Sequence, residues 1–171
     1  KDINELADTL RMAFKIAKSG RPGPVLVDIP KDVQVAKCEF TANTQPVIPY
    51  PLTFAPEDKL MQAAKLINSC ERPYIYFGGG VISGKASEEI IALAQKIDAP
   101  IGCSLMGLSA VPSDEPHFLG MQGMHGHYAS SVAQDESDLV ITRGARFSDR
   151  ATGNKSRFAK NFKIIHIDID G

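Results

Sequence analysis

The sequence predicts an α/β protein: a doubly wound parallel sheet, preceded by a helix-strand tail from another α/β domain. From Pro56 onward, short apolar runs alternate with segments of helical spacing, and several runs are followed by glycine-rich connections. Strands separated by helices favour right-handed crossovers, and therefore a parallel sheet with helices on both faces. A proline-containing stretch without periodicity, residues 36–55, predicts a linker between the two parts.

The first part begins with a predicted helix that ends near Gly20, a residue suited to helix termini. Apolar residues at helical spacing share one of its faces: Ile3, Leu6, Ala7, Leu10, Ala13, Phe14 and Ala17. Residues 20–24 (GRPGP) predict a turn, and residues 25–29 (VLVDI) predict a buried strand. One helix and one strand cannot bury both of their apolar faces, so we expect this pair to belong to a larger sheet.

The second part begins with a helix at Pro56, because Pro suits the first turn and Glu57 and Asp58 suit the positive end of the helix dipole. Its inward-facing residues are predicted to be Leu60, Ala63, Ala64 and Ile67. Strands are predicted at 73–77, 99–104, 138–144 and 163–169, with further helices at 86–97 and 128–134.

Composition excludes several classes of function. Nineteen basic and 20 acidic side chains give a net charge of −1, which provides no electrostatic case for binding nucleic acid or an anionic membrane. No apolar run approaches the roughly 20 residues that span a bilayer. The three cysteines show no C-x-x-C spacing and predict reduced thiols in a cytoplasmic protein. The chain begins at Lys1 without methionine and ends directly after an apolar strand, so we expect a piece of a longer protein.

Ligands of parallel α/β sheets bind beyond the carboxyl ends of the strands, and candidate segments follow each predicted strand. Gly78, Gly79 and Gly80 lie between a strand and a helix, where backbone N–H groups can approach a phosphate; a tight structural turn is an equally good interpretation. Ser104 follows the second strand and could contact a ligand, although an ordinary loop is the simpler interpretation.

Two further segments combine glycines with charged or aromatic side chains. Residues 119–128 (LGMQGMHGHY) suggest a backbone wrapped around a flat, partly apolar ligand. The alternatives there are a zinc site at His125 and His127, disfavoured by the scarcity of other ligands, or a histidine that only anchors its loop. Residues 142–153 carry Arg143, Arg146 and Arg150 around Asp149, a pattern that suits phosphate binding or a salt-bridged surface loop. Asp168 ends the last strand, where a carboxylate can accept hydrogen bonds from ribose hydroxyls. Together, these segments favour an extended dinucleotide.

Several motifs resemble one enzyme family in the same order and spacing over nearly the whole chain. Residues 19–34 (SGRPGPVLVDIPKDVQ) resemble the end of the pyrimidine-binding domain of acetolactate synthase large subunits, also called acetohydroxyacid synthases. The motifs SLMGLSAVP, LGMQGMHG, GARFSDRATG and HIDID resemble the middle domain of that family, which is Rossmann-like. The resemblance divides the chain into a pyrimidine-domain tail (1–35), a linker (36–55) and a central FAD-binding-like domain (56–171) that is truncated at its C-terminus.

The resemblance implies that the central domain binds FAD, which takes no redox part in the main reaction. Carried over by motif, the cofactor-binding residues are Arg21, Gly79, Ser104, Leu105, Gln122, Gly123, Met124, His125, Gly144, Ala145, Arg146, Phe147, Ser148, Asp168 and Ile169. Two of them depart from many relatives: Ser104 stands where Thr is common, and Ser148 where Asp is common. No catalytic residue or metal ligand is assigned to this chain.

The resemblance also implies an enzyme of branched-chain amino-acid biosynthesis that condenses pyruvate with a second 2-keto acid. Thiamine diphosphate and Mg²⁺ would bind other domains of the same polypeptide, in a homodimer or tetramer with a possible regulatory small subunit. We therefore expect the 171 residues alone to be inactive and free of FAD. Two alternatives remain: the central domain of a related thiamine-diphosphate carboligase or decarboxylase that binds ADP or no nucleotide, and an NAD-dependent oxidoreductase, which the absence of G-x-G-x-x-G disfavours.

Overall fold

The computed structural model describes residues 2–51, 54–154, 158 and 160–170 of the chain. These residues divide into two compact units, one made of residues 1–54 and 169–171 and the other of residues 55–168. Leu52 and Thr53 of the predicted linker, and Gly171 at the end of the predicted central domain, lie outside the described residues. In the described part of the chain, no helix has the length and apolar character needed to cross a bilayer.

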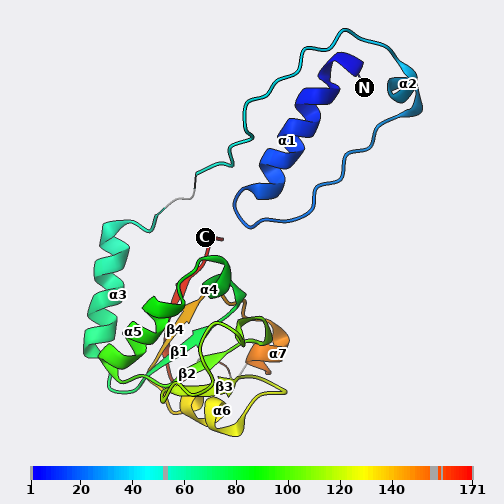
Figure 1. Ribbon diagram of the computed structural model, residues 1–171. Helices are drawn as coiled ribbons and strands as arrows, with labels where there is room; N and C mark the ends of the chain where they lie inside the picture. The colour runs from blue at the N-terminus through cyan, green and yellow to red at the C-terminus, as the bar shows by residue number, and fades with distance from the viewer. Residues whose placement is uncertain (1, 52–53, 155–157, 159, 171) are drawn as a thin grey trace. The chain divides into compact units, whose positions relative to one another are not determined.

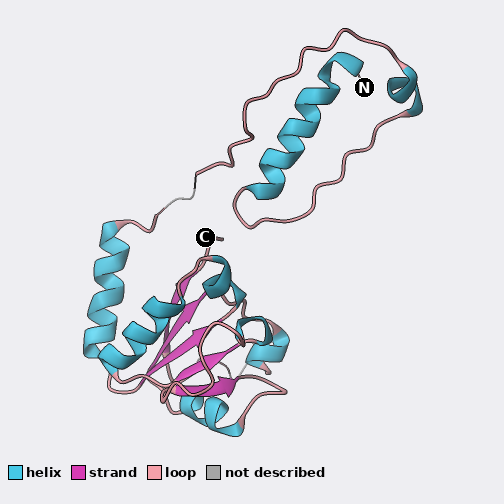
Figure 2. Cartoon of the chain, viewed as in Figure 1, coloured by secondary structure: helices cyan, strands magenta, loops and turns pink. Residues whose placement is uncertain are grey.

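The second unit is built on a parallel sheet, which confirms the predicted fold class. Its described strands are β1 (Pro73–Phe77), β2 (Ile101–Cys103), β3 (Phe118–Met121), β4 (Leu139–Arg143) and β5 (Lys163–Ile167). They are arranged in the order β3-β2-β1-β4-β5, and each neighbouring pair is parallel (Figure 2). The order reverses between β1 and β4, so the topological switch point of this sheet lies between those two strands.

Alternate residues of the central strands bury opposite faces of the sheet, as expected for the period of two. Ile75, Phe77 and Ile141 pack on one face, with α3 (Glu57–Ser69) and α5 (Ser87–Ile97). Tyr74, Tyr76 and Val140 pack on the other, with residues of α6 (Tyr128–Asp135) and α7 (Asp149–Thr152). Figure 1 shows these two layers of helices on either side of the sheet. The arrangement is doubly wound.

Helix α3 begins at Glu57, one residue after the predicted start at Pro56, and only part of its predicted inward face packs against the core. Ala63 and Ile67 pack against the core as expected, together with Leu66. Leu60 remains 55% exposed and Ala64 is also exposed. The contact stripe is narrower than the apolar stripe of the sequence because one helix edge meets the sheet and the other faces solvent.

The sequence predicts a glycine-rich connection where the structure has the strand β3. This strand has four residues, is half-buried throughout and contains Gly120 at φ +85. It lies at the edge of the sheet, and its register with β2 shifts between Ile101 and Cys103. A short edge strand with an internal glycine carries neither the alternation nor the apolar run that identifies a strand from sequence.

The first unit contains a short 3₁₀ turn (Ile3–Glu5), α1 (Leu6–Lys18) and α2 (Lys31–Val35). Helix α1 ends before Gly20, whose φ of +55 is consistent with the predicted stop. The predicted strand at 25–29 is wrong: these residues form no strand, and Leu26 is 88% exposed. A parallel strand needs a neighbour to satisfy its backbone groups, and the described part of this unit contains no strand that could pair with it.

Candidate functional site

The predicted site segments of the second unit follow the carboxyl ends of its strands. Because all neighbouring strands are parallel, their carboxyl ends lie at one edge of the sheet. The last residues of the strands are Phe77, Cys103, Met121, Arg143 and Ile167. Backbone hydrogen bonds join the connections there: Ser104 N–H donates to Phe77 O at 2.8 Å, and Gly144 N–H donates to Ile167 O at 2.9 Å. The predicted residues of this unit therefore form one rim, which we call the carboxyl rim.

At the switch point the glycine connections pack backbone against backbone. Gly78 N–H donates to Arg143 O at 3.1 Å, and Gly80 N–H donates to Gly144 O at 3.0 Å. A Cβ on Gly80 would lie 2.5 Å from Gly144 Cα, and a Cβ on Gly78 would lie 2.5 Å from Gly144 O. Gly144 itself has φ +56. Close packing thus explains Gly78, Gly80 and Gly144, and the amides of Gly78 and Gly80 are already used within the fold.

The connection after β2 places apolar side chains on the rim. Leu105 and Met106 begin a 3₁₀ turn (Leu105–Gly107) and are 69% and 74% exposed. Gly79 lies against this turn, since a Cβ there would be 3.2 Å from Met106 Cβ. Ser104 is half-buried beside it. The rim therefore presents exposed apolar surface directly beside the switch point.

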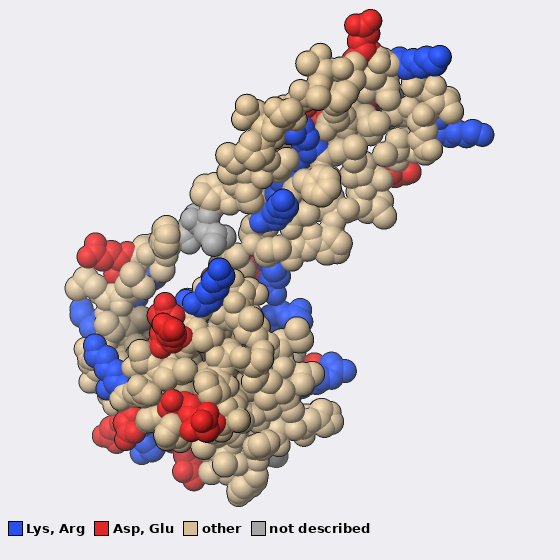
Figure 3. All heavy atoms as spheres, in the orientation of Figure 1, with Lys and Arg blue, Asp and Glu red and all other residues tan. Residues whose placement is uncertain are grey.

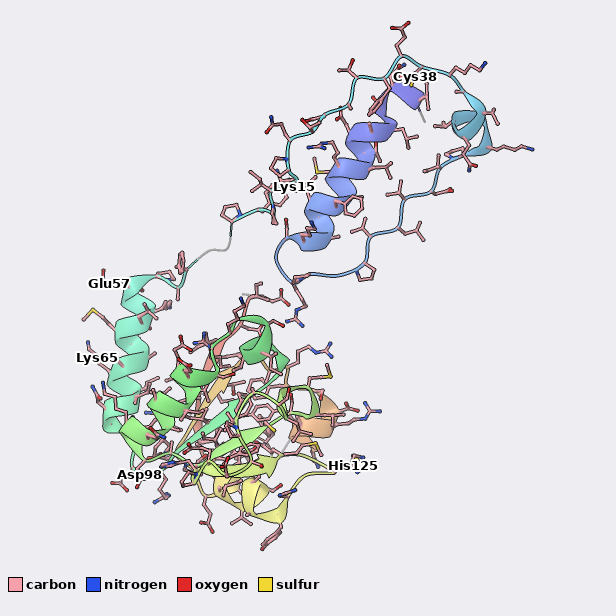
Figure 4. All side chains as sticks on the ribbon, viewed as in Figure 1. Lys15, Cys38, Glu57, Lys65, Asp98 and His125 are labelled. Atoms are coloured by element: carbon pink, nitrogen blue, oxygen red, sulfur yellow. The ribbon has the colours of Figure 1, made fainter. Side chains whose placement is uncertain are left out.

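The connection after β3 is anchored by backbone hydrogen bonds and exposes several of its side chains. Gln122 N–H donates to Cys103 O at 2.8 Å, and Met124 N–H donates to Arg150 O at 2.9 Å. Gly123 has φ +102, and a Cβ there would lie 2.5 Å from Arg150 O. Met124 is 70% exposed, and His125 is exposed at the end of this connection (Figure 4). Gln122, by contrast, is only 8% exposed and its side chain points into the fold.

The connection after β4 exposes a cation and packs an aromatic side chain against neighbouring rings. Arg146 is exposed, whereas Ala145 is buried. Phe147 is half-buried and packs on aromatic rings, with centroid distances of 5.1 Å to His166 and 6.4 Å to Tyr76. Phe147 is thus primarily a packing residue.

The predicted arginine cluster in this connection is only partly formed. Arg150 Nη1 lies 3.7 Å from Asp149 Oδ1. No described ion pair joins Arg143 or Arg146 to that carboxylate. Ser148 precedes α7 and accepts a hydrogen bond from Thr152 Oγ1 at its carbonyl. Arg146 is consequently an exposed guanidinium that has no described ion pair with Asp149.

A carboxylate lies at the end of β5. The Asp168 side chain is 8% exposed, and its Oδ2 is 3.6 Å from His166 Nε2, which also contacts Ala145 O at 3.1 Å. The two remaining predicted residues, Arg21 and Ile169, belong to the first unit, where Arg21 Nη2 pairs with Asp170 Oδ2 at 2.6 Å.

The structure adds two residues that the sequence analysis did not select. Tyr74 Oη donates to Gln122 Oε1 at 2.8 Å and lies 2.8 Å from Ser130 Oγ. Burial raises the pKa of Tyr74 above its usual range, so the phenol keeps its proton and remains a donor. An apolar strand pattern contains no signal for this role, because a tyrosine in it is equally well explained by packing.

A hollow of about 540 Å³ adjoins the connection after β3, on the α6 side of the sheet. Its described walls come from Gln122 to Met124, from α6 and from residues 151–154, 158 and 160–162. Lys and Arg are interspersed with Asp and Glu over the visible surface of the second unit, without a field of one sign (Figure 3). Among the described residues, no group of three or more His, Cys, Asp or Glu side chains could hold a metal ion.

Comparison with known proteins identifies relatives over the whole chain. Residues 60–171 match the family model described as the thiamine pyrophosphate enzyme, central domain. The chain is 46% identical over 173 residues to the isozyme 1 large subunit of acetolactate synthase from Escherichia coli. It is 40% identical over 174 residues to the acetolactate synthase large subunit of Haemophilus influenzae. Each alignment covers 99% of this chain but only 30% of the relative.

A solved structure shares the fold. It is the X-ray structure of a Mycobacterium smegmatis protein assigned as a thiamin diphosphate-dependent enzyme, with a TM-score of 0.70 and 24% sequence identity. The match covers 96% of this chain and 31% of that one.

Proposed function

The chain belongs to the thiamine pyrophosphate enzyme family, whose central domain it contains, and from this premise we propose that it is the FAD-binding central region of an acetolactate synthase large subunit. Identity of 40–46% to acetolactate synthase large subunits over 99% of the chain supports this choice within the family. The chain spans about 30% of the length of those relatives, so the remaining parts of the enzyme come from sequence outside it.

The observation that carries the proposal is the mixture of groups on the carboxyl rim. FAD requires apolar surface for its ring system, a cation for its pyrophosphate and an acceptor for its ribose hydroxyls. The rim offers Leu105, Met106 and Met124 as exposed apolar side chains, Arg146 as an exposed guanidinium and Asp168 as a carboxylate. These residue types fit the dinucleotide.

Each of these residues has a distinct task in the proposed complex. Arg146 pairs with the pyrophosphate, because a guanidinium forms charge-assisted hydrogen bonds with phosphate oxygens. Asp168 accepts hydrogen bonds from ribose hydroxyls, and Leu105 and Met124 exclude water from the ring system. Gly79, Ser104, Gly123 and His125 line the same connections and bring backbone close to the ligand. FAD then serves a structural role and takes no redox part in the main reaction.

The complete enzyme is proposed to condense pyruvate with a second 2-keto acid in branched-chain amino-acid biosynthesis. It would act in the cytoplasm, as a homodimer or tetramer with a possible regulatory small subunit. Thiamine diphosphate and Mg²⁺ would bind domains outside this chain and supply the carbanion chemistry. The relatives are large subunits of acetolactate synthase, which supports a partner of this kind.

The test uses the full-length protein and its Arg146→Ala variant. We expect the purified protein to contain FAD, and the variant to bind it about tenfold more weakly, as expected for the loss of a charge-assisted hydrogen bond. Lys65→Ala is the control, because Lys65 is exposed on α3 and lies away from the carboxyl rim (Figure 4). A full-length protein that binds ADP but no flavin would favour a related carboligase or decarboxylase instead.

A further inference from the structure

A buried group of three polar side chains connects the centre of the sheet to the carboxyl rim. Tyr74 lies on β1, Gln122 begins the connection after β3, and Ser130 lies on α6. Tyr74 and Ser130 are fully buried, and Gln122 is 8% exposed. The phenol oxygen of Tyr74 is 2.8 Å from both Gln122 Oε1 and Ser130 Oγ. Three elements distant in sequence thus meet at one hydroxyl.

The single proton of the phenol determines which group donates and which accepts in each of these hydrogen bonds. Tyr74 has one phenol proton, which it donates to Gln122 Oε1. The Ser130 hydroxyl must then donate to the phenol oxygen, because the phenol has no second proton. Gly102 on the neighbouring strand leaves room for this hydroxyl, since a Cβ there would overlap the phenol oxygen. The site is therefore shaped around the hydroxyl as well as around the ring.

We propose that the Tyr74 hydroxyl is a positioning group that sets the conformation of Gln122–His125 and, through it, the affinity for flavin. The inference rests on the proposed function for its second part only. Gln122 is the first residue of the connection, and its side chain is directed inward to Tyr74 while Met124 is directed outward. The inward-directed Gln122 side chain therefore holds the beginning of the segment Gln122–His125, whose exposed end faces the proposed ligand.

The backbone of this segment offers reporters of that conformation. The amides of Gln122, Met124, Gly126 and His127 all donate hydrogen bonds, to Cys103 O, Arg150 O, Gly123 O and Met121 O respectively. In ligand-free protein, hydrogen exchange at these amides measures how often the segment opens. Amides of β1 and β4 in the same protein report the stability of the sheet, so the two effects separate.

The experiment compares Tyr74→Phe with Tyr76→Phe in the full-length protein. Both tyrosines lie on β1, face the same side of the sheet and are at most 2% exposed. The described hydrogen bonds with Gln122 and Ser130 involve Tyr74. After removal of flavin, we expect Tyr74→Phe to raise exchange at the four reporter amides about tenfold, as for a buried hydrogen-bond partner left unsatisfied. Tyr76→Phe should leave those amides unchanged relative to the sheet.

The second measurement is FAD affinity. We expect Tyr74→Phe to weaken it about tenfold and Tyr76→Phe to leave it unchanged. In a Gln122→Leu background, Tyr74→Phe should produce no additional effect on reporter exchange, because the shared hydrogen bond is already absent.

Equal exchange changes at the reporter amides and the sheet amides, or identical results for the two tyrosine variants, would overturn the proposal. If the exchange results agree but the wild-type protein binds no FAD, the positioning role holds and the flavin function fails. If FAD affinity stays unchanged while the reporters respond, Tyr74 orders the segment but does not control the ligand.

Discussion

The switch-point glycines allow a direct test of whether their small size serves packing or ligand binding. The substitution is Gly80→Ala in α4 (Gly79–Ser83). Its new Cβ would lie 2.5 Å from Gly144 Cα and 3.0 Å from Gly144 O, both backbone atoms that cannot rotate away. Gly80 has no positive φ, so backbone strain at the substituted residue does not contribute.

The expected magnitude follows from two opposing effects. Forcing a methyl group into a packed site costs about 1–3 kcal/mol, and contact with backbone atoms favours the upper end of that range. Replacing a helical glycine by alanine returns about 1 kcal/mol of backbone entropy. The net loss is thus about 2 kcal/mol, which lowers the melting temperature of a unit of this size by about 8 °C.

Urea and thermal unfolding of flavin-free protein measure this change. Gly84→Ala is the matched control, because Gly84 ends the same short helix at φ −85 and meets only Gly80 O, at 3.0 Å. We expect the control to stay within about 0.5 kcal/mol of wild type. If Gly80→Ala unfolds together with wild type and the control, the connections after β1 and β4 can separate without cost. The packing explanation of these glycines would then be wrong.

Two further predictions concern a histidine between two carboxylates and a buried threonine. His117 Nδ1 lies 3.0 Å from Glu115 Oε1, and its Nε2 lies 3.1 Å from Asp98 Oδ1. Hydrogen bonds to these carboxylates raise the pKa of His117, and the bond from His117 lowers the pKa of Glu115. The stability advantage of wild type over His117→Ala should therefore be full between about pH 4.5 and 6.5, the ordinary pKa values of the glutamate and histidine side chains. It should shrink as pH rises through the raised pKa of His117; a difference independent of pH in urea titrations would refute the linkage. Thr142 Oγ1 is buried without a hydrogen-bond partner among the described residues. Thr142→Val should therefore raise the free energy of unfolding by about 1 kcal/mol, and a measured loss would reveal a partner for the hydroxyl.

Much of the second unit could be predicted from sequence because its elements carry their own burial pattern. The strand predicted at 73–77 has those bounds in the structure, and the helix predicted to begin at Pro56 begins one residue later, at Glu57. Apolar residues recur with a period of 2 in the strand and 3.6 in the helix, so the sequence of each segment predicts which of its faces is buried. The predictions for β3 and for residues 25–29 were wrong for opposite reasons. The edge strand β3 forms although its sequence has little hydrophobic periodicity. Residues 25–29 have an apolar strand pattern, but the described part of their unit contains no strand to pair with.

The candidate site shows the same division. Glycine-dense and arginine-bearing connections were recognisable from sequence, because residue type alone indicates flexible backbone and phosphate-binding chemistry. Which glycines pack against one another was not recognisable, since that follows from β1 and β4 being neighbours in the sheet. The same holds for Tyr74, whose partners Gln122 and Ser130 lie 48 and 56 residues away.

The sequence by itself therefore determined the fold class, most elements of the sheet and the segments that reach its carboxyl edge. The tertiary structure decided the order of the strands, the packing role of Gly80 and Gly144, and the buried support beneath Gln122. The physical reason is the range of the interactions involved. Periodicity and turn chemistry act between residues a few positions apart, whereas strand neighbours and buried hydrogen bonds depend on contacts that exist only after the chain has folded.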